Sequence, residues 1–179
     1  MDGELIRAEI KVPGQHQVTN TLAAVRVAKL LGLDMEQMTR GIASVVPIAG
    51  RNRIIQEGNF TLIDDCYNAN PVSMKAALDL LSLADTRKVA ILGDMFELGE
   101  NSDMLHSGVG CYAKGKTDLL ICIGENAKHI YDGAKEAGVA HIYHFTDKES
   151  FLREKENLLQ AGDTILLKAS HGMAFETLI

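Results

Sequence analysis

The chain has 179 residues, 46% of them apolar, which is enough for one ordinary domain with a sound core and argues against intrinsic disorder. Eighteen Lys and Arg against 24 Asp and Glu give a formal net charge of -6. Because the charges are scattered along the chain, we expect no basic face and no nucleic-acid partner.

The first 50 residues predict a strand, two helices and a linker. Residues 5–12 alternate with period two and predict a strand that Pro13-Gly14 ends. A stripe at helical spacing then predicts a helix, which Asn20 or Thr21 caps and Gly32 ends. A second short helix is expected over about residues 35–45, and residues 47–50 are interpreted as a linker.

From residue 53 onward, short β-rich runs alternate with amphipathic helices. Two runs on either side of Glu57-Gly58-Asn59 predict a hairpin. The predicted strands are residues 53–56, 60–63, 89–92, 119–123, 141–145 and 164–167, and the predicted helices start after Asn70-Pro71 and at about residues 104–114, 126–137 and 148–160. This order predicts an α/β fold with a mainly parallel sheet and helices on both faces.

The cysteines and the hydropathy pattern indicate in which cellular compartment the protein is expected. Cys66, Cys111 and Cys122 form no C-x-x-C pair, so they predict neither a disulfide framework nor a zinc site. No apolar run approaches the roughly 18 residues of a membrane span, and residues 1–11 lack the apolar block of a signal peptide. We therefore expect a cytoplasmic protein without a membrane span.

Ligands of parallel sheets bind beyond the carboxyl ends of the strands, and the densest polar cluster of the chain lies at such an end, in residues 64–71. Asn70 with Pro71 is explained as a helix cap with proline at the first helical position. Capping does not explain Asp65 or Asn68. A carboxylate at a strand end can accept hydrogen bonds from a ribose, and an Asn amide can bind both a carboxylate and an amine. We favour a functional role for this pair, with a plain turn as the alternative. Cys66 has no identifiable base and is not interpreted as a nucleophile.

Two further strand ends carry polar residues. Asp94, Glu97 and His106 follow the run that ends at residue 92. We interpret these three residues as structural and expect no metal site there. Residues 168–172 place Lys168 and several hydrogen-bond donors at the same edge, where an anionic group could dock; a solvated strand end is the alternative.

The chain contains no G-x-x-x-x-G-K-[ST] phosphate loop, no G-x-G-x-x-G after a strand and no G-x-S-x-G elbow. These residues alone predict a ligand-binding domain without specifying a reaction.

A series of motifs runs in order through nearly the whole chain: residues 14–20 with Leu22-Ala23-Ala24, Gly50-Arg51, residues 64–71 with Ser73, residues 92–99 with His106, and residues 168–173. Together they resemble the Mur ligases of bacterial cell-wall synthesis. The likeness is strongest to the branch that adds D-alanyl-D-alanine to UDP-N-acetylmuramoyl tripeptide.

The resemblance implies a three-domain enzyme. Residues 1–47 would be the tail of a central ATP-binding domain, a strand plus a helical pair, and residues 48–179 the C-terminal ligase domain. The partners would be the two substrates and the missing N-terminal and central domains of the same chain. ATP and Mg²⁺ would serve the full-length enzyme, with the phosphate loop and magnesium ligands upstream. We therefore expect this chain alone to bind no cofactor tightly and to show no ATP hydrolysis.

The resemblance also implies roles for particular residues, with no complete catalytic set and no metal ligand in this chain. The implied nucleotide contacts are His16, Gln17, Asn20, Arg51 and Asp65. The implied substrate contacts are Tyr67, Asn68, Asn70, Ser170 and His171. Gln17 stands where the family usually has Asn, and His171 where it usually has Arg.

The implied chemistry is ATP-driven amide formation through an acyl phosphate, because phosphorylation removes the carboxylate charge that repels an amine and creates a leaving group. Two alternatives remain open. One is a stand-alone α/β nucleotide- or metabolite-binding module, and the other is a ligase resembling folylpolyglutamate synthetases, against which Tyr67-Asn68-Ala69-Asn70 argues.

Overall fold

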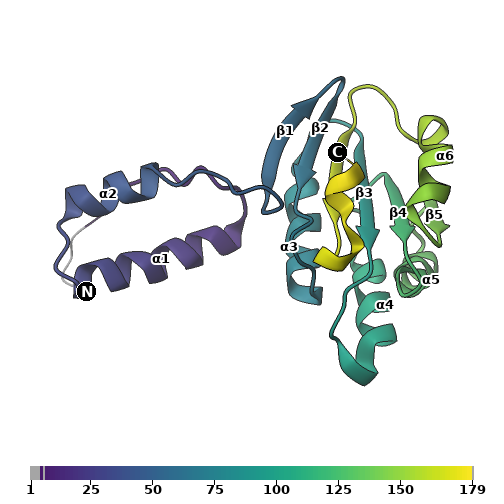
Figure 1. The fold of residues 1–179 in the computed structure, drawn as a ribbon, viewed down its shortest axis with the longest axis horizontal. Helices are drawn as coiled ribbons and strands as arrows, with labels where there is room; N and C mark the ends of the chain where they lie inside the picture. The colour runs from purple at the N-terminus through teal and green to yellow at the C-terminus, as the bar shows by residue number, and fades with distance from the viewer. Residues whose placement is uncertain (1–4, 6, 179) are drawn as a thin grey trace. The chain divides into compact units, whose positions relative to one another are not determined.

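The computed structural model describes residue 5 and residues 7–178. It divides into two compact units whose boundary falls between Ile48 and Ala49. We call the part before this boundary the helical unit and the part after it the sheet unit (Figure 1). In the described part of the chain, no helix is both long enough and apolar enough to cross a membrane.

The helical unit contains α1 (Gln15–Leu30) and α2 (Met35–Ala43). The prediction that α1 starts at a cap near Asn20 is wrong: the helix already begins after Gly14, which has a φ of 113° and offers no side-chain cap. Gly14 supplies a backbone conformation that other residues rarely adopt, so the chain enters the helix without a polar cap. The end of α1 agrees with the prediction, since Gly32 follows it with a φ of 83°. The start of α2 is capped by Asp34, which forms a capping box with Gln37.

The strand predicted over residues 5–12 is not found. Residue 5 and residues 7–12 belong to no strand, and Ile6 lies outside the described residues. A strand is stabilised by ladder hydrogen bonds to a neighbour, and the described residues of the helical unit include no other strand. Period-two alternation alone was therefore not sufficient for a strand here.

The sheet unit is built on a six-stranded sheet with the strand order β1-β2-β6-β3-β4-β5. β1 pairs antiparallel with β2, and the remaining pairs are parallel. The strands are β1 (Arg53–Glu57), β2 (Phe60–Asp64), β3 (Lys88–Gly93), β4 (Leu119–Ile123), β5 (Ile142–Phe145) and β6 (Thr164–Lys168). The mainly parallel sheet predicted from the sequence is confirmed, with an antiparallel hairpin strand at one edge.

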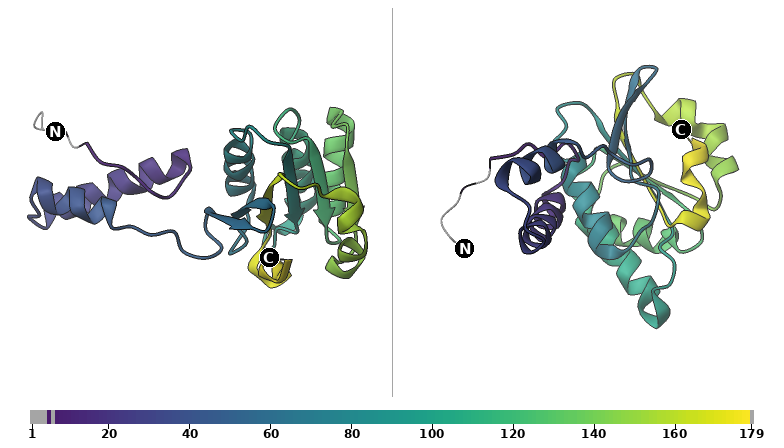
Figure 2. Two further views of the ribbon diagram at one scale, coloured as in Figure 1. Left: turned by 90° about the horizontal axis from the view of Figure 1, so that it is seen from above. Right: turned by 60° about the vertical axis from the view of Figure 1, so that its left-hand side comes forward.

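Helices cover both faces of this sheet (Figure 2). On one face, α3 (Pro71–Leu81), α4 (Ser102–Tyr112) and α5 (Ala127–Ala137) pack against one set of alternate strand residues, including Ala90 and Leu92 of β3. On the other face, α6 (Lys148–Leu158) and the short helix η3 (Phe175–Leu178) pack against the other set, including Val89 and Ile91. Alternate side chains of a strand point to opposite faces, so a sheet covered on both sides has strands that are apolar throughout.

The strand order fixes where loops meet. β2, β6 and β3 are neighbours, and their register aligns Asp64 with Leu167 and Leu92 with Lys168. Their carboxyl ends therefore lie side by side. The segment 65–70 follows β2, the segment 94–101, with the short helix η1 (Gly99–Asn101), follows β3, and the segment after β6 contains η2 (His171–Met173). The sheet thus brings three segments from distant parts of the sequence to one edge.

Candidate functional site

A cavity of about 260 Å³ opens at the carboxyl edge of β2, β6 and β3; we call it the rim cavity. Each of the three loops contributes to its lining, which consists of Tyr67, Asn68, Phe96, Glu97, Ser170, His171 and Gly172. Tyr67 and Phe96 are each about half exposed, at 48% and 42% of the residue surface. A hollow that combines aromatic surface with a few polar groups is the usual form of a small-ligand site.

Residues 50–52 are hydrogen-bonded to the end of β2 and to the segment that follows it. The Gly50 amide donates to Asp64 Oδ2 at 2.7 Å, and the Asn52 amide donates to Asp65 Oδ1 at 3.2 Å. In return, the Tyr67 amide donates to the Gly50 carbonyl at 2.9 Å. Gly50 has a φ of 74°, and a Cβ there would press on Tyr67 at 3.1 Å, so the turn requires glycine.

This turn places Arg51 over an aromatic ring. The guanidinium carbon lies 4.2 Å from the centroid of Tyr67, a cation–π contact, and the His171 ring lies 5.6 Å from the same centroid. Within residues 5 and 7–178, the Arg51 guanidinium has no carboxylate partner. It therefore offers its donors to an anionic group beside the rim cavity.

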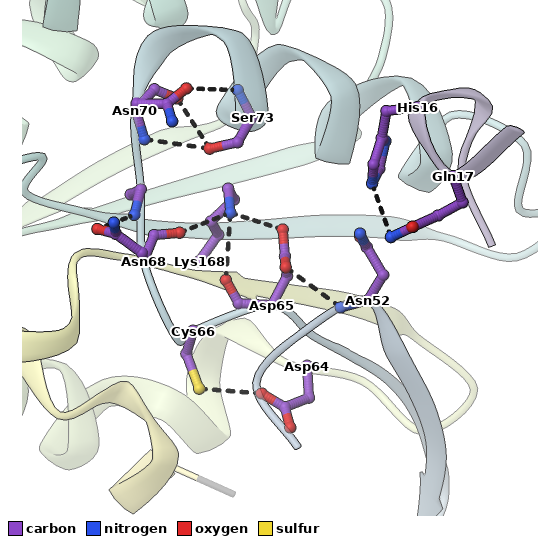
Figure 3. Close-up of polar contacts among 11 residues, drawn as sticks. His16, Gln17, Asn52, Asp64, Asp65, Cys66, Asn68, Asn70, Ser73 and Lys168 are labelled. Atoms are coloured by element: carbon purple, nitrogen blue, oxygen red, sulfur yellow. Dashed lines mark hydrogen bonds and ion pairs between the residues drawn. The ribbon is translucent and has the colours of Figure 1, made fainter. Parts of the chain in front are cut away.

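Lys168 holds the segment 65–68, which contributes to the rim cavity, in place. Its side chain is buried, and its ammonium donates to Asp65 Oδ2 at 2.6 Å, to the Asp65 carbonyl at 3.3 Å and to the Asn68 carbonyl at 2.9 Å (Figure 3). The suggestion that Lys168 helps an anion to dock at the strand end is wrong, because these internal acceptors take up its hydrogen bonds. Lys168 instead neutralises the Asp65 carboxylate and holds the 65–68 segment in place.

The segment after β3 is tied to the segment after β6. The Phe96 amide donates to Ser170 Oγ at 2.8 Å, and the Ser170 amide donates to the Asp94 carbonyl at 3.0 Å. The Met95 amide donates to Nε2 of buried His106 at 2.9 Å. Two loops that line the rim cavity are therefore held in one arrangement before any ligand arrives.

Asp94 and His106 serve the fold. Asp94 Oδ1 accepts a hydrogen bond of 2.7 Å from the Ala127 amide at the start of α5. Nδ1 of His106 donates to the Ser102 carbonyl at 2.8 Å, so both ring nitrogens are used within the fold. The part of the chain that the structure describes contains no group of three His, Cys, Asp or Glu side chains able to hold a metal ion.

Cys66 is a buried thiol beside a carboxylate. Its Sγ donates to Asp64 Oδ1 at 2.9 Å. Burial, followed by the hydrogen bond to Asp64, raises the pKa of Cys66 from 9.0 to about 12. The thiol therefore stays protonated at neutral pH, which disfavours a role as nucleophile.

The structure brings together most of the site residues expected in the sheet unit. Four of them line the rim cavity: Tyr67, Asn68, Ser170 and His171. Arg51 and Asp65 adjoin these residues through the Tyr67 stack and the Lys168 bonds. Their roles toward ligands stay predictions.

The other expected site residues lie elsewhere. Asn70 does not line the rim cavity; its Oδ1 accepts from the Ser73 amide at 2.9 Å and caps α3. His16, Gln17 and Asn20 lie on α1 in the helical unit. Gln17 Nε2 is 3.2 Å from His16 Nε2 (Figure 3), and Asn20 Nδ2 donates to Gln17 Oε1, also at 3.2 Å.

Phe96 and Glu97 line the rim cavity although neither was predicted as a site residue. Both stand in the run 92–99 that belongs to the motif series, but Glu97 is interpreted there as a structural residue. The available signal was their place directly after a strand whose carboxyl end is at the edge where ligands of parallel sheets bind.

Comparisons with known proteins agree with this architecture. Residues 50–171 match the family described as Mur ligase, glutamate ligase domain. The chain is 31% identical over 175 residues to the UDP-N-acetylmuramoyl-tripeptide--D-alanyl-D-alanine ligase of Bacillus subtilis, covering 95% of this chain and 38% of the relative. The chain thus spans well under half the length of the curated relatives it matches.

Solved structures give the same result. MurF from Acinetobacter baumannii superposes with a TM-score of 0.86 at 31% identity, over 96% of this chain and 38% of the other. MurF from Thermotoga maritima, solved in complex with ADP, matches with a TM-score of 0.76 at 25% identity, over 92% of this chain and 37% of the other.

The folylpolyglutamate alternative is not favoured. The bifunctional folylpolyglutamate synthase/dihydrofolate synthase of Yersinia pestis is only 16% identical, with a TM-score of 0.68 over 99% of this chain and 41% of the other, which shows a likeness in fold alone. The family match, the curated relatives and the structures together show that the chain belongs to the Mur ligase family.

Proposed function

We propose that this chain is the amino-component-binding part of an ATP-dependent ligase that joins D-alanyl-D-alanine to UDP-N-acetylmuramoyl tripeptide in peptidoglycan synthesis. One observation carries the proposal: four of the five residues implied as the dipeptide site, Tyr67, Asn68, Ser170 and His171, line one preformed cavity. The names of the relatives supply the two substrates.

The lining residues suit a small peptide. Asn68 Oδ1 accepts from the Ala69 amide at 2.8 Å, which orients its amide group and leaves the NH₂ to donate. Ser170 Oγ accepts from the Phe96 amide, and its own O–H can donate in turn. Such donors bind a peptide carbonyl or carboxylate, and the exposed faces of Tyr67 and Phe96 bind small apolar side chains.

In the proposed reaction, ATP phosphorylates the tripeptide carboxylate and ADP leaves. The dipeptide amine then attacks the acyl carbon, a C–N bond forms, the C–O bond to phosphate breaks, and the amine gives up a proton. Arg51, held over Tyr67 without a carboxylate partner in the described chain, would stabilise the charge on the nucleotide or the acyl phosphate. The contribution of the sheet unit is to hold and orient the amine.

We propose that the helical unit belongs to a larger ATP-binding body, with His16 as a nucleotide contact and Gln17 and Asn20 as adenine contacts. α1 has no buried residue, and Leu22, Val27 and Leu30 are all more than half exposed. An apolar helical surface of this kind is stable in water only when further structure covers it.

Magnesium would assist the phosphoryl transfer, but the described residues supply no three-ligand set for it, and we assign no step through the metal to this chain. A cytoplasmic location belongs to the same proposal, and the three free cysteines are typical of a reducing compartment.

Titration of the ¹⁵N-labelled chain with D-alanyl-D-alanine, followed by amide chemical shifts, tests the dipeptide site. We expect the largest shifts at residues 67–69, 96–97 and 170–172, and small shifts with L-alanyl-L-alanine at the same concentrations. Saturable shifts centred on another part of the sheet unit, or none at all, would contradict the proposal.

A further inference from the structure

The charges around the rim cavity are arranged asymmetrically. The strand order β2-β6-β3 places Tyr67 on one side of the cavity and Glu97 on the other, with His171 between them. Arg51 is stacked on Tyr67 and so adds a permanent cation to the first side. Of the seven described residues that line the cavity, Glu97 alone is acidic.

The Glu97 carboxylate is free to bind a ligand. It has no hydrogen-bond or ion-pair partner within residues 5 and 7–178, and the residue is exposed. The neighbouring acids are different. Asp65 is paired with Lys168, and Asp94 accepts from the Ala127 amide. The negative charge that the cavity offers therefore comes from Glu97.

The backbone of Glu97 is in an unfavourable conformation. Its φ of 62° lies in the left-handed region, where glycine is relaxed and a glutamate is not. The bonds from Met95 to His106 and from Phe96 to Ser170 hold the preceding residues, so the conformation is imposed by the fold. Strain maintained in this way is a frequent feature of ligand-contacting residues. At this position the strained residue lines the cavity.

From this geometry we infer that Glu97 receives the ammonium group of the incoming amino component and selects ligands with a free amine; the inference rests on the proposed function and deepens it. A dipeptide zwitterion carries its two charges at opposite ends. Its ammonium binds at Glu97, and its carboxylate accepts hydrogen bonds from Ser170 and Asn68, so Arg51 remains available to the nucleotide or the acyl phosphate. Glu97 is a specificity residue that positions the amine for attack.

Calorimetric titration of the chain with D-alanyl-D-alanine and with N-acetyl-D-alanyl-D-alanine tests the inference. The acetylated probe keeps the carboxylate and lacks the ammonium. Wild-type protein is expected to bind the free dipeptide at least about ten-fold more tightly, as a charge-assisted hydrogen bond allows. Glu97→Gln is expected to reduce the ratio to within about two-fold, whereas the matched control Glu100→Gln, just outside the lining, keeps it.

Glu97→Gly separates binding from folding. Glycine relaxes the backbone at φ 62°, so we expect a Tm at or above that of the wild type together with loss of the preference for the free amine. If the wild type binds the dipeptide and both Glu97 variants keep its preference, the inference is overturned and the proposed function stands. If the wild type binds neither probe, both are overturned.

Discussion

The site rests on one buried charge pair that links two distant segments. Lys168 and Asp65 are 103 residues apart in sequence, and the exposed fractions of their side chains are 2% and 12%. Removing one partner of such a pair leaves an uncompensated buried charge, which costs far more than the pair contributes to stability. The 65–68 segment therefore cannot leave its position without breaking this buried ion pair.

Lys168→Met is expected to lower the free energy of unfolding by about 3–5 kcal/mol. Adding Asp65→Asn to the same variant should recover part of that loss, because the amide carries no charge. The control is Lys128→Met, which removes an exposed pair with Asp132 and should cost less than about 1 kcal/mol. Urea denaturation measures all three; equal losses for Lys168→Met and Lys128→Met would contradict this account of the site.

Cys66 gives the stability a pH dependence on the alkaline side. The unfolded thiol ionises near pH 9, whereas the folded thiol keeps its proton until about pH 12. Its contribution is fully present below pH 9 and is lost as the pH rises toward 12, because the folded state then binds more protons than the unfolded state.

Between pH 9 and 10.5, Cys66→Ala should reduce the loss of unfolding free energy by about 1–2 kcal/mol, at about 1.4 kcal/mol per pKa unit. Part of the slope should remain, since burial also raises the pKa of Cys122. Urea denaturation under reducing conditions provides the measurement, with exposed Cys111→Ala as control. An unchanged slope in Cys66→Ala would show that this thiol is not held protonated by the fold.

At the scale of elements, α4 and α5 pack closely because glycines face the partner helix. A Cβ on Gly110 would collide with the Ile130 carbonyl, and one on Gly133 would collide with the Ser107 carbonyl. Gly108, on the same helix as Gly110, has open space around its Cβ position. Two glycines in one helix are therefore predicted to respond to alanine in opposite directions.

Gly110→Ala should lower the free energy of unfolding by about 1–3 kcal/mol through overpacking. Gly108→Ala should raise it by about 0.5–1 kcal/mol, because alanine has the higher helix propensity. Thermal unfolding monitored by circular dichroism compares the two. A stabilising Gly110→Ala would mean that the two helices are not packed as closely as described.

The sequence predicted the elements of the sheet unit well because their signals are local. The start of α3 follows from Asn70-Pro71, and each strand is a short apolar run. The errors have non-local or backbone causes: α1 begins at a glycine without a polar cap, and residues 7–12 find no strand partner.

In the candidate site, too, some features follow from local sequence and others depend on distant segments. The polar loops could be found from their position after strands, but the burial of Lys168 depends on a segment about 100 residues away. The left-handed backbone of Glu97 follows from hydrogen bonds that tie the two preceding residues to His106 on α4 and to Ser170, and nothing in the local sequence indicates it.

At the scale of the whole molecule, the two units differ in how well they bury their own apolar residues. The sheet unit has a core on each face of its sheet, whereas α1 buries no residue. This difference favours a sheet unit that forms its site by itself and a helical unit that acts as part of a larger ATP-binding body, which is the division of labour that the proposed ligase requires.

A chimera tests this claim most directly. The segment of the Bacillus subtilis ligase that matches this chain is replaced by the chain, and the purified protein is assayed for joining D-alanyl-D-alanine to UDP-N-acetylmuramoyl tripeptide with ATP. We predict dipeptide-dependent formation of the amide product and ADP, lost in a version carrying Lys168→Met. A folded chimera that binds ATP and forms no product, beside an active parent enzyme, would contradict the account.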